Sequence, residues 1–279
     1  MLRADAFATL TFIAPFRRIL GRESGISILM YHSVSNRNEC GHPYYRTVTS
    51  PEVFGRQMDH LASNGYSVVT PAEVVKALPA ARSGQSRLVA ITFDDGYEDF
   101  YTHAFPILSK YKYTATVYLP TKYIKTTAQT FKGVKCLTWE RVRELGRAGI
   151  EFGSHTVTHP QLRTLAQKEI DYEVTQSKET IEERLGRAVN SFAYPYAFPE
   201  GDRPFMLRLR DSLERAGYDS GVSTIIGTVV APGDRFFLRR LPVNSEDESE
   251  LFQAKLAGAY DWLHSFQYAG KQVKRILQR

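Results

Sequence analysis

Two acidic residues stand side by side at the end of an apolar run, in the segment LVAITFDDG at residues 88–96. Neighbouring carboxylates repel each other when both are ionised in a poorly solvated place, so Asp94 and Asp95 form a costly pair unless a cation or a proton neutralises one of them. Turn chemistry is one explanation, because Asp and Gly favour turns. A metal site is the other, with one acid as a ligand and the second as a general base.

Two histidines four residues apart supply candidate ligands for such a metal. His155 and His159 lie in EFGSHTVTHPQL, residues 151–162. Pro160 disfavours helical geometry at His159 and the preceding residues have a strand pattern, so we expect both histidines in a loop after a strand. Two imidazoles and one carboxylate make an open site for one divalent ion, favouring Zn²⁺, with Co, Fe, Mn or Ni as alternatives. Such an ion lowers the pKa of a water molecule and polarises a carbonyl group.

These residues need a scaffold that brings separate strand ends together. Strand-like apolar runs alternate with helix-like amphipathic segments along most of the chain, which predicts a parallel sheet covered by helices and closed into a (β/α) barrel, with an open doubly wound sheet as the alternative. In a barrel, the C-terminal ends of the strands form one rim, so the acids and the histidines would meet there. The predicted strands are residues 26–31, 66–69, 88–93, 114–119, 150–154, 191–194 and 220–224.

Helix start signals lie between these runs. Ser50 precedes Pro51 at one predicted start, and the pair Thr70 and Glu73 has the spacing of a capping box. Thr164 and Gln167 form another candidate box. It precedes an apolar stripe at helical spacing, formed by Ile170, Val174, Ile181 and Leu185.

Length and composition favour one folded domain of the α/β class. The chain has 279 residues with 43% hydrophobic content, which suits a single barrel. Its two cysteines, Cys40 and Cys136, form no CxxC motif and no framework spacing, so we expect free thiols rather than a cysteine zinc site or a disulfide-stapled fold.

Several motifs together resemble a known family. TFDDGY at 92–97, SHTVTH at 154–159 and FAYPYA at 192–197 resemble the first three motifs of the polysaccharide deacetylases, the NodB-homology domain or carbohydrate esterase family 4, and LMYHSVS at 29–35 extends the likeness. The resemblance covers roughly residues 25–245. It implies a single-domain, distorted (β/α) barrel with about seven parallel strands. It also implies metal-dependent hydrolysis of an N-acyl, or occasionally O-acyl, group on a sugar.

The resemblance also implies roles for individual residues. Asp94 would be the general base, and Asp95, His155 and His159 would hold the metal. The backbone N–H of Tyr196 would stabilise the oxyanion formed when water attacks the acyl carbon. Pro195, in the same motif, would line the substrate site.

Two positions depart from the family pattern. Ala193 stands where many members carry an arginine that pairs with the base, and no late strand-end histidine is evident to serve as the general acid. His32, after the first predicted strand, is our candidate for the acid or for a substrate contact, with a structural histidine as the alternative. Arg240 would either replace the missing arginine from another strand or bind substrate through a carboxylate or phosphate.

The leading hypothesis is a metal-dependent hydrolase that removes an N-acetyl group from an amino sugar in a polysaccharide, oligosaccharide or lipid-linked glycan precursor. One alternative keeps the metal site and changes the substrate to a formamide, cyclic imide or other small amide. The other alternative is a non-catalytic glycan-binding module.

Charge and termini bear on location and partners. The net charge is +6, but the basic residues are spread along the chain without a nucleic-acid motif, so we expect a glycan partner and no nucleic acid. We divide the chain into a basic and apolar extension (1–24), the deacetylase-like domain (25–245) and a C-terminal helical segment with a basic amphipathic tail (246–279). Basic residues mixed with apolar ones in both termini suggest peripheral contact with an anionic membrane, and an ordinary solvated terminal helix is the alternative. The N-terminal stretch makes a poor secretory signal, so we expect a cytoplasmic protein beginning near Met1.

Overall fold

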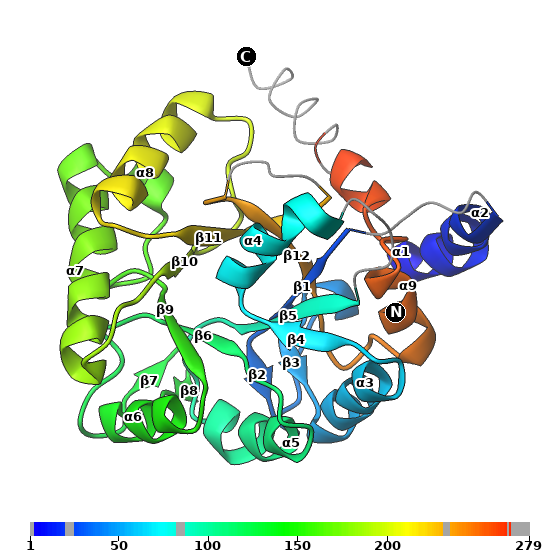
Figure 1. Ribbon diagram of the computed structural model, residues 1–279, viewed down its shortest axis with the longest axis horizontal. Helices are drawn as coiled ribbons and strands as arrows, with labels where there is room; N and C mark the ends of the chain where they lie inside the picture. Colours follow the sequence, from blue (N-terminus) through cyan, green and yellow to red (C-terminus); the bar gives the residue numbers. More distant parts are fainter. Residues whose placement is uncertain (1–2, 20–24, 82–86, 231–234, 267, 269–279) are drawn as a thin grey trace.

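The structure is a computed structural model that describes residues 3–19, 25–81, 87–230, 235–266 and 268. Its centre is a parallel sheet in the strand order β1-β12-β11-β10-β9-β6-β5, and β5 also pairs with β1, which closes the ring (Figure 1). Seven parallel strands therefore form the closed barrel within the described residues, as expected. Their bounds are β1 Ser27–Tyr31, β5 Leu88–Phe93, β6 Thr116–Leu119, β9 Glu151–Ser154, β10 Ser191–Ala193, β11 Ser220–Ile226 and β12 Leu238–Pro242.

Six of the seven predicted strands belong to the closed ring, and the seventh does not. The predicted run at 66–69 becomes β4, Ser67–Val69, which pairs with the first half of β5 and stands outside the closed ring. Its place in the barrel is taken by β12, which the sequence patterns did not predict because Arg239 and Arg240 interrupt its apolar run. Outside the ring lie two short pairs, β2 Ser33–Val34 with β3 Val48–Thr49, and β7 Thr130–Phe131 with β8 Val134–Lys135.

Alternation along β5 shows how a strand buried on both faces points its side chains. Val89, Ile91 and Phe93 belong to the large core between the sheet and the outer helices. Ala90 belongs to a second cluster, inside the barrel. Because side chains alternate along a strand, Thr92 and Asp94 continue the inward series toward the rim.

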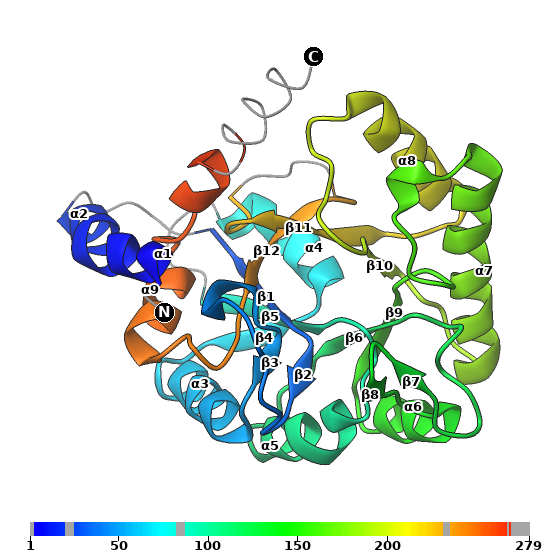
Figure 2. The ribbon, with the colours of Figure 1, turned by 180° about the vertical axis from the view of Figure 1, so that it is seen from behind.

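Helices cover the outside of the barrel and one of its ends. Val74 and Leu78 of α4 join the cluster inside the barrel, and α4 crosses in front of the strands in Figure 1, so it closes that end. The β7–β8 hairpin lies at the opposite end, which faces the viewer in Figure 2. The helix bounds are α3 Pro51–Ser63, α4 Pro71–Ala81, α5 Phe105–Lys110, α6 Trp139–Arg147, α7 Gln167–Leu185, α8 Arg203–Arg215 and α9 Ser249–Leu256, with short 3-10 turns at Pro43–Tyr45 and Leu162–Thr164 and a π turn at Phe100–Ala104.

Two of the three predicted helix starts are confirmed. The Ser50 hydroxyl accepts from the Val53 N–H at 3.2 Å, and Thr70 and Glu73 bond reciprocally, at 3.2 and 2.7 Å. The predicted box at Thr164 is wrong, because its hydroxyl donates to the Gln161 carbonyl in the preceding 3-10 turn.

Helix α7 begins instead after Ala166. The N–H of Ala166 donates to the Glu169 carboxylate at 2.8 Å. Glu169 therefore caps the start of the helix in place of the predicted pair of Thr164 and Gln167. The apolar stripe that follows is buried as predicted at Ile170, Val174 and Ile181, and Leu185 packs partly buried against the same core.

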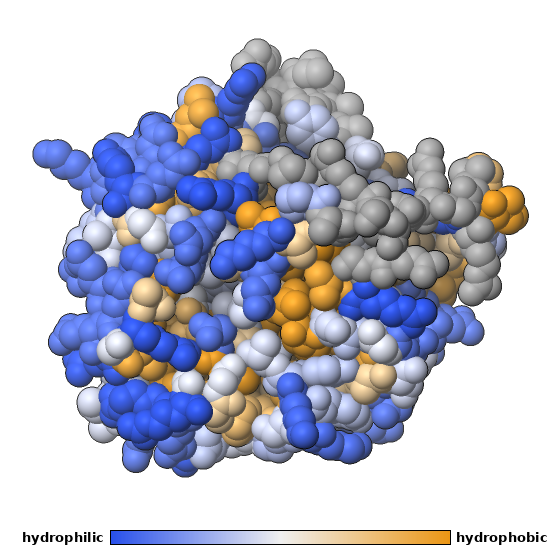
Figure 3. Space-filling model, in the orientation of Figure 1, coloured by the Kyte–Doolittle hydropathy of each residue, from blue (hydrophilic) through white to orange (hydrophobic). Residues whose placement is uncertain are grey.

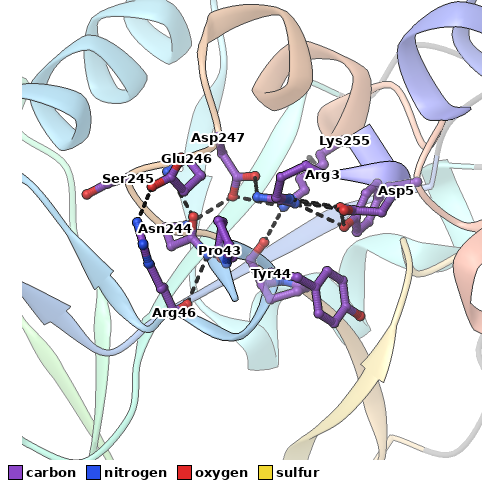
Figure 4. A network of polar contacts seen from close by, with 12 residues as sticks. Arg3, Asp5, Pro43, Tyr44, Arg46, Asn244, Ser245, Glu246, Asp247 and Lys255 are labelled. Atoms are coloured by element: carbon purple, nitrogen blue, oxygen red, sulfur yellow. Dashed lines mark hydrogen bonds and ion pairs between the residues drawn. The ribbon is translucent and has the colours of Figure 1, made fainter. Parts of the chain in front are cut away.

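The N-terminal segment forms a continuous helical rod beside α9: α1 Ala4–Ala8, a π turn at Thr9–Ile13 and α2 Ala14–Ile19. A partly buried charge network holds its start (Figure 4). Arg3 donates to Asp5 at 2.5 Å and to Asp247 at 3.2 Å, and Lys255 of α9 donates to Asp247 at 2.8 Å. The rod is therefore joined to the barrel by specific contacts. The predicted basic tail at 271–279 lies outside the described residues.

Two further expectations concern the cysteines and the membrane. Cys40 is exposed and Cys136 is buried, and both are free thiols, as predicted. Burial raises the pKa of the Cys136 thiol to about 12. None of the helices in the described ranges is both long and apolar enough to cross a bilayer.

Candidate metal centre and active site

Asp94 follows β5 and meets Arg240 of β12 at the inner rim. Nη1 and Nη2 of Arg240 each donate to one carboxylate oxygen of Asp94, both at 2.7 Å. The same guanidinium donates to the Thr92 hydroxyl at 3.2 Å and to the Ser223 carbonyl at 2.9 Å, and Arg240 is fully buried. A bidentate ion pair of this kind fixes the orientation of the carboxylate and favours its charged form.

This pair decides the protonation state of Asp94. Burial alone would raise the pKa of the carboxyl, but the charge of Arg240, with smaller contributions from His155 and His32, lowers it to about 2. Asp94 is therefore ionised at neutral pH and can accept a proton.

Asp95 points elsewhere because its backbone turns sharply. Its φ is +68° and that of Gly96 is +60°, a left-handed conformation that a non-glycine residue adopts rarely and at a cost. The turn separates the two neighbouring carboxylates. Oδ2 of Asp95 accepts from the Tyr97 hydroxyl at 2.9 Å and from Lys132 Nζ at 3.2 Å.

The other oxygen of Asp95 faces the two histidines. Oδ1 lies 3.3 Å from Nε2 of His159 and 3.7 Å from Nε2 of His155, and one ligand atom from each of the three residues lies within 4.8 Å of the others. All three residues are buried. In the described structure, Oδ1 of Asp95 and Nδ1 of His159 are buried without a hydrogen-bond partner. Two nitrogens and one oxygen around an unsatisfied buried carboxylate atom fit a divalent ion such as zinc.

His155 is held in the orientation that a ligand needs. Its Nδ1 lies 2.8 Å from the carbonyl oxygen of Ala193, so that nitrogen carries the proton and Nε2 is left toward Asp95. Burial lowers the pKa of His155 to about 4, although the Asp94 carboxylate opposes the change. The imidazole is neutral at physiological pH, which is the form that coordinates metals.

The loop that carries both histidines is tied to α7 by one acid. The buried carboxylate of Glu173 accepts from the backbone N–H of Val157 at 2.7 Å, from the N–H of Thr158 at 2.9 Å and from the Thr158 hydroxyl at 2.7 Å. His159 has φ +57°, and its N–H donates to the Thr156 hydroxyl at 2.9 Å. As expected from Pro160, the histidines lie in a loop after β9 and not on a helix.

Tyr196 lies over the metal ligands at the mouth of the site. Its backbone has φ +62°, its carbonyl accepts from the Thr224 hydroxyl at 3.0 Å, and its ring centroid is 4.6 Å from that of His159. The side chain is 47% exposed, which makes it accessible to a substrate. Pro195, immediately before it, is buried in the turn.

His32 and Arg240 complete the set of expected residues. His32 follows β1, and its electrostatic neighbours are Asp94, Asp95, Arg240 and Lys132, which places it at the same rim. Burial lowers the pKa of His32, and the two carboxylates oppose that change. Arg240 takes the first of its two expected roles in geometry: its buried guanidinium is engaged with Asp94, which leaves it poorly placed for direct binding of substrate.

Lys132 is a site residue that sequence reasoning missed. It stands at the tip of the β7–β8 hairpin, where Lys132 and Gly133 both have positive φ, +51° and +77°, as in a tight two-residue turn. Its Nζ lies 4.6 Å from the Phe131 ring centroid and 5.5 Å from that of Tyr196. In the sequence, the Lys-Gly pair between two short runs of β-forming residues was the signal that could have indicated this hairpin.

Glu173 was missed as well, and a stronger signal existed for it. It occupies a position on the apolar stripe of α7, between Ile170 and Val174, where an acid is expected only if it has internal partners. Tyr97 follows the acids by two residues and gave no sign of its bond to Asp95.

Comparisons with known proteins agree with this geometry. A family model described as polysaccharide deacetylase matches residues 81–220, half of the chain. A predicted polysaccharide deacetylase of Bacillus subtilis (strain 168) is 29% identical over 229 residues, which are 82% of this chain and 75% of that protein. A poly-beta-1,6-N-acetyl-D-glucosamine N-deacetylase of Escherichia coli (strain K12) is 29% identical over 143 residues, or 48% of this chain and 21% of that protein.

A solved structure extends the similarity to three dimensions. The deacetylase PplD of Streptococcus pyogenes, in complex with acetate, superposes with a TM-score of 0.70 at 26% identity. The match covers 84% of this chain and 99% of that one. This chain therefore shares the barrel and the surrounding helices of that solved deacetylase.

Proposed function

Because this chain belongs to the polysaccharide deacetylase family, a family of hydrolases that cleave acyl groups from sugars, we propose that it removes an acetyl group from an N-acetylated amino sugar in a glycan. The proposal rests on the different surroundings of the two neighbouring acids. Asp94 is ionised and oriented by Arg240, while Asp95 faces His155 and His159. One carboxylate is thus available for a proton and the other for a metal.

Asp95, His155 and His159 would hold a divalent metal, for which zinc suits the donor set best. When bound, such an ion supplies a lowered pKa for water and polarises the acyl carbonyl. Asp94 accepts a proton from the water molecule while the water oxygen attacks the acyl carbon. The backbone N–H of Tyr196 donates to the developing oxyanion. The C–N bond then breaks, the amine leaves with a proton, and acetate remains.

His32 is the proposed donor of the proton to the leaving amine. It lies among the charges of Asp94, Asp95, Arg240 and Lys132. Asp94, which holds the proton taken from water, is a second group at the rim that could return it. Replacing His32 separates these routes, because a general acid contributes typically 10²- to 10⁴-fold to the rate.

The names of the relatives support the substrate class. The Escherichia coli relative acts, by its name, on poly-beta-1,6-N-acetyl-D-glucosamine, and the Streptococcus pyogenes neighbour was solved with acetate, the second product of such a reaction. Exposed Tyr196 at the mouth offers a ring on which a sugar can stack. The cytoplasmic location expected from the sequence stays a prediction.

The test pairs metal content with acetate release. Wild type, Asp94→Asn and the control Asp211→Asn, which changes an exposed acid of α8, are loaded with zinc and assayed on N-acetylglucosamine oligomers. We expect stoichiometric metal in all three proteins, with acetate release lost in Asp94→Asn and retained in the control. Metal without acetate release by wild type would redirect the search to formyl or imide substrates or to glycan binding. Absence of metal from wild type would contradict the mechanism.

A further inference from the structure

The outer face of the N-terminal rod carries large apolar side chains that nothing in the described structure covers. Phe7, Phe12 and Phe16 are 57, 61 and 60% exposed, and Ile19 is 81% exposed. We call these four residues the outer stripe. Single exposed apolar residues are ordinary on a protein surface, but four on one short rod form a patch that needs an explanation.

A π turn brings the members of the outer stripe into line. In a regular α-helix, residues five apart diverge by about 140°, whereas a π turn has about one more residue per turn. The π turn at Thr9–Ile13 therefore aligns Phe12 with Phe7, and their ring centroids are 6.0 Å apart in an edge-to-face contact. Phe16 and Ile19 follow at the ordinary spacings of four and three residues.

The opposite face of the rod is fixed to the barrel. Thr9 is fully buried, and its hydroxyl accepts from the indole N–H of Trp262 at 3.0 Å. At the start of the rod, Arg3 and Asp5 join a partly buried network with Asp247 and Lys255 (Figure 4). The Tyr260 hydroxyl also donates to Asp5. The rod cannot turn over to hide the outer stripe without breaking these contacts.

The sequence of the rod carries more basic than acidic residues, while Glu250 lines the adjoining groove and Glu23 follows the rod in the sequence. Asp5 is the sole acid in the sequence between residues 3 and 22, and its carboxylate is turned inward to Arg3 and Tyr260. In the sequence, Arg17 and Arg18 fall within the rod and Arg22 follows shortly after its end. The whole chain carries a net charge of +6. This apolar surface with a basic flank is complementary to anionic lipid.

The size of the outer stripe suits a membrane surface better than a second protein copy. With about 200 Å² for each large side chain, the exposed fractions amount to roughly 500 Å². A stable protein interface needs about 800 Å² on each partner. A groove of about 630 Å³ continues the surface from Ile19 toward Ala254 of α9, and its lining is mostly apolar with Arg17, Glu250 and Gln253 among it. Figure 3 shows apolar residues at the outer end of the rod, in the region labelled α2 in Figure 1.

We propose that the outer stripe seats this protein on a bilayer that contains anionic lipid, with the rod lying in the interfacial plane. Figures 1 and 2 place the rod on the flank of the barrel, away from both the end closed by α4 and the end that carries the β7–β8 hairpin. The rim with Asp94 and the histidines stays open to a glycan while the flank contacts lipid. This inference does not depend on the deacetylase reaction.

Vesicle flotation tests the proposal. The double variant Phe12→Glu/Phe16→Glu places two charges in the outer stripe, and Leu207→Glu changes a residue of α8 that is 46% exposed, as a matched control. We expect wild type and the control to float with phosphatidylglycerol–phosphatidylcholine vesicles, and the double variant to bind at least tenfold less. Floating should be weaker with pure phosphatidylcholine. Circular dichroism checks that each variant is folded.

Three results would overturn the proposal. Wild type could stay in the soluble fraction with anionic vesicles, or the folded double variant could float as well as wild type. Light scattering could also reveal a dimer that the double variant dissolves, without vesicle binding, in which case a second copy covers the stripe. Acetate release from soluble oligomers, measured in parallel, should be equal for wild type and the double variant, so failure of the proposed function is detected separately.

Discussion

Arg240 and Asp94 lie 146 residues apart in sequence and face each other at the inner rim, joined by two hydrogen bonds of 2.7 Å. β1 separates their strands in the ring, so neither local sequence nor strand pairing brings them together. Ala193 occupies the position at which the family pattern often has an arginine. The barrel thus supplies the base with its cation from β12.

Removal of the Arg240 charge should change the pH dependence of the reaction. The charge of Arg240 opposes the effect of burial and keeps the pKa of Asp94 low, at about 2. In Arg240→Gln that pKa rises, Asp94 is protonated at higher pH, and the acid limb of the kcat/KM profile moves to higher pH. Misplacement of the base should also lower kcat/KM about 10²-fold. The pH–rate profile of the zinc-loaded protein measures both effects.

Arg240→Lys is the matched control for that experiment. Lysine keeps the positive charge, so the acid limb should stay near its wild-type position. Because lysine cannot form the bidentate contact, kcat/KM should remain reduced. Metal content should be unchanged in both variants, since the guanidinium donates to Thr92, Asp94 and Ser223. An unshifted acid limb in Arg240→Gln would mean that Arg240 does not control Asp94.

The same arginine shows where prediction from sequence reached its limit. The apolar run of β5 and the acids after it were predictable, because strand and motif are contiguous and strand ends in a barrel meet at one rim. β12 was not, because Arg239 and Arg240 break the apolar run that marks a buried strand. The residue that obscured the strand is the one that the site requires, as is common where local rules fail at functional positions.

Other omissions have different physical causes. Lys132 reaches Asp95 from a hairpin of two-residue strands, too short for an alternating pattern. β4 had the right composition, but pairing with the first half of β5 leaves it outside the ring, which only the register decides. The π turn of the N-terminal rod shifts the helical period by one residue, so no single periodicity identifies the outer stripe.

Metal binding should stabilise the folded protein by an amount that rises with the logarithm of the metal concentration divided by its Kd. A ligand at 100 times its Kd contributes about 2.7 kcal/mol to the free energy of unfolding. For a domain of this size we expect a rise in Tm of about 5 °C when zinc is added to the metal-free protein. Asp95→Asn should show no comparable rise, while Asp211→Asn, at an exposed position, should match wild type. Differential scanning calorimetry checks this, and an equal rise in Asp95→Asn would place the zinc elsewhere.

Glu173 should act on the metal through the loop that it holds. In Glu173→Gln, the amide oxygen can still accept from the N–H groups of Val157 and Thr158, but the negative charge is lost, so these bonds are no longer charge-assisted and become weaker. We expect about a 10- to 100-fold loss of zinc affinity, as for other residues that orient ligands. The free energy of unfolding should fall by about 2 kcal/mol.

The control for this change is Glu179→Gln, at an exposed position of the same helix. It should leave both quantities at their wild-type values. Zinc titration with a competing chelator, together with urea unfolding of the metal-free proteins, separates the effect on the site from the effect on the fold. Wild-type zinc affinity in Glu173→Gln would show that the histidine loop holds its shape without this acid.

Gly153 of β9 should tolerate no side chain, because the ring of Tyr118 lies against it inside the barrel. A Cβ at this position would stand 2.4 Å from two ring carbons of Tyr118 and 2.7 Å from the carbonyl oxygen of Ser191. The hydroxyl of Tyr118 is bonded to the Ser191 hydroxyl at 2.7 Å, so the ring cannot move away without losing that contact. Gly153→Ala should therefore lower the free energy of unfolding by about 2 kcal/mol or more. Gly55→Ala in α3, where no atom lies within 4 Å of the new Cβ, should raise it by about 1 kcal/mol. Urea unfolding of the two variants measures the difference, and equal stabilities would mean that the barrel interior yields at Tyr118.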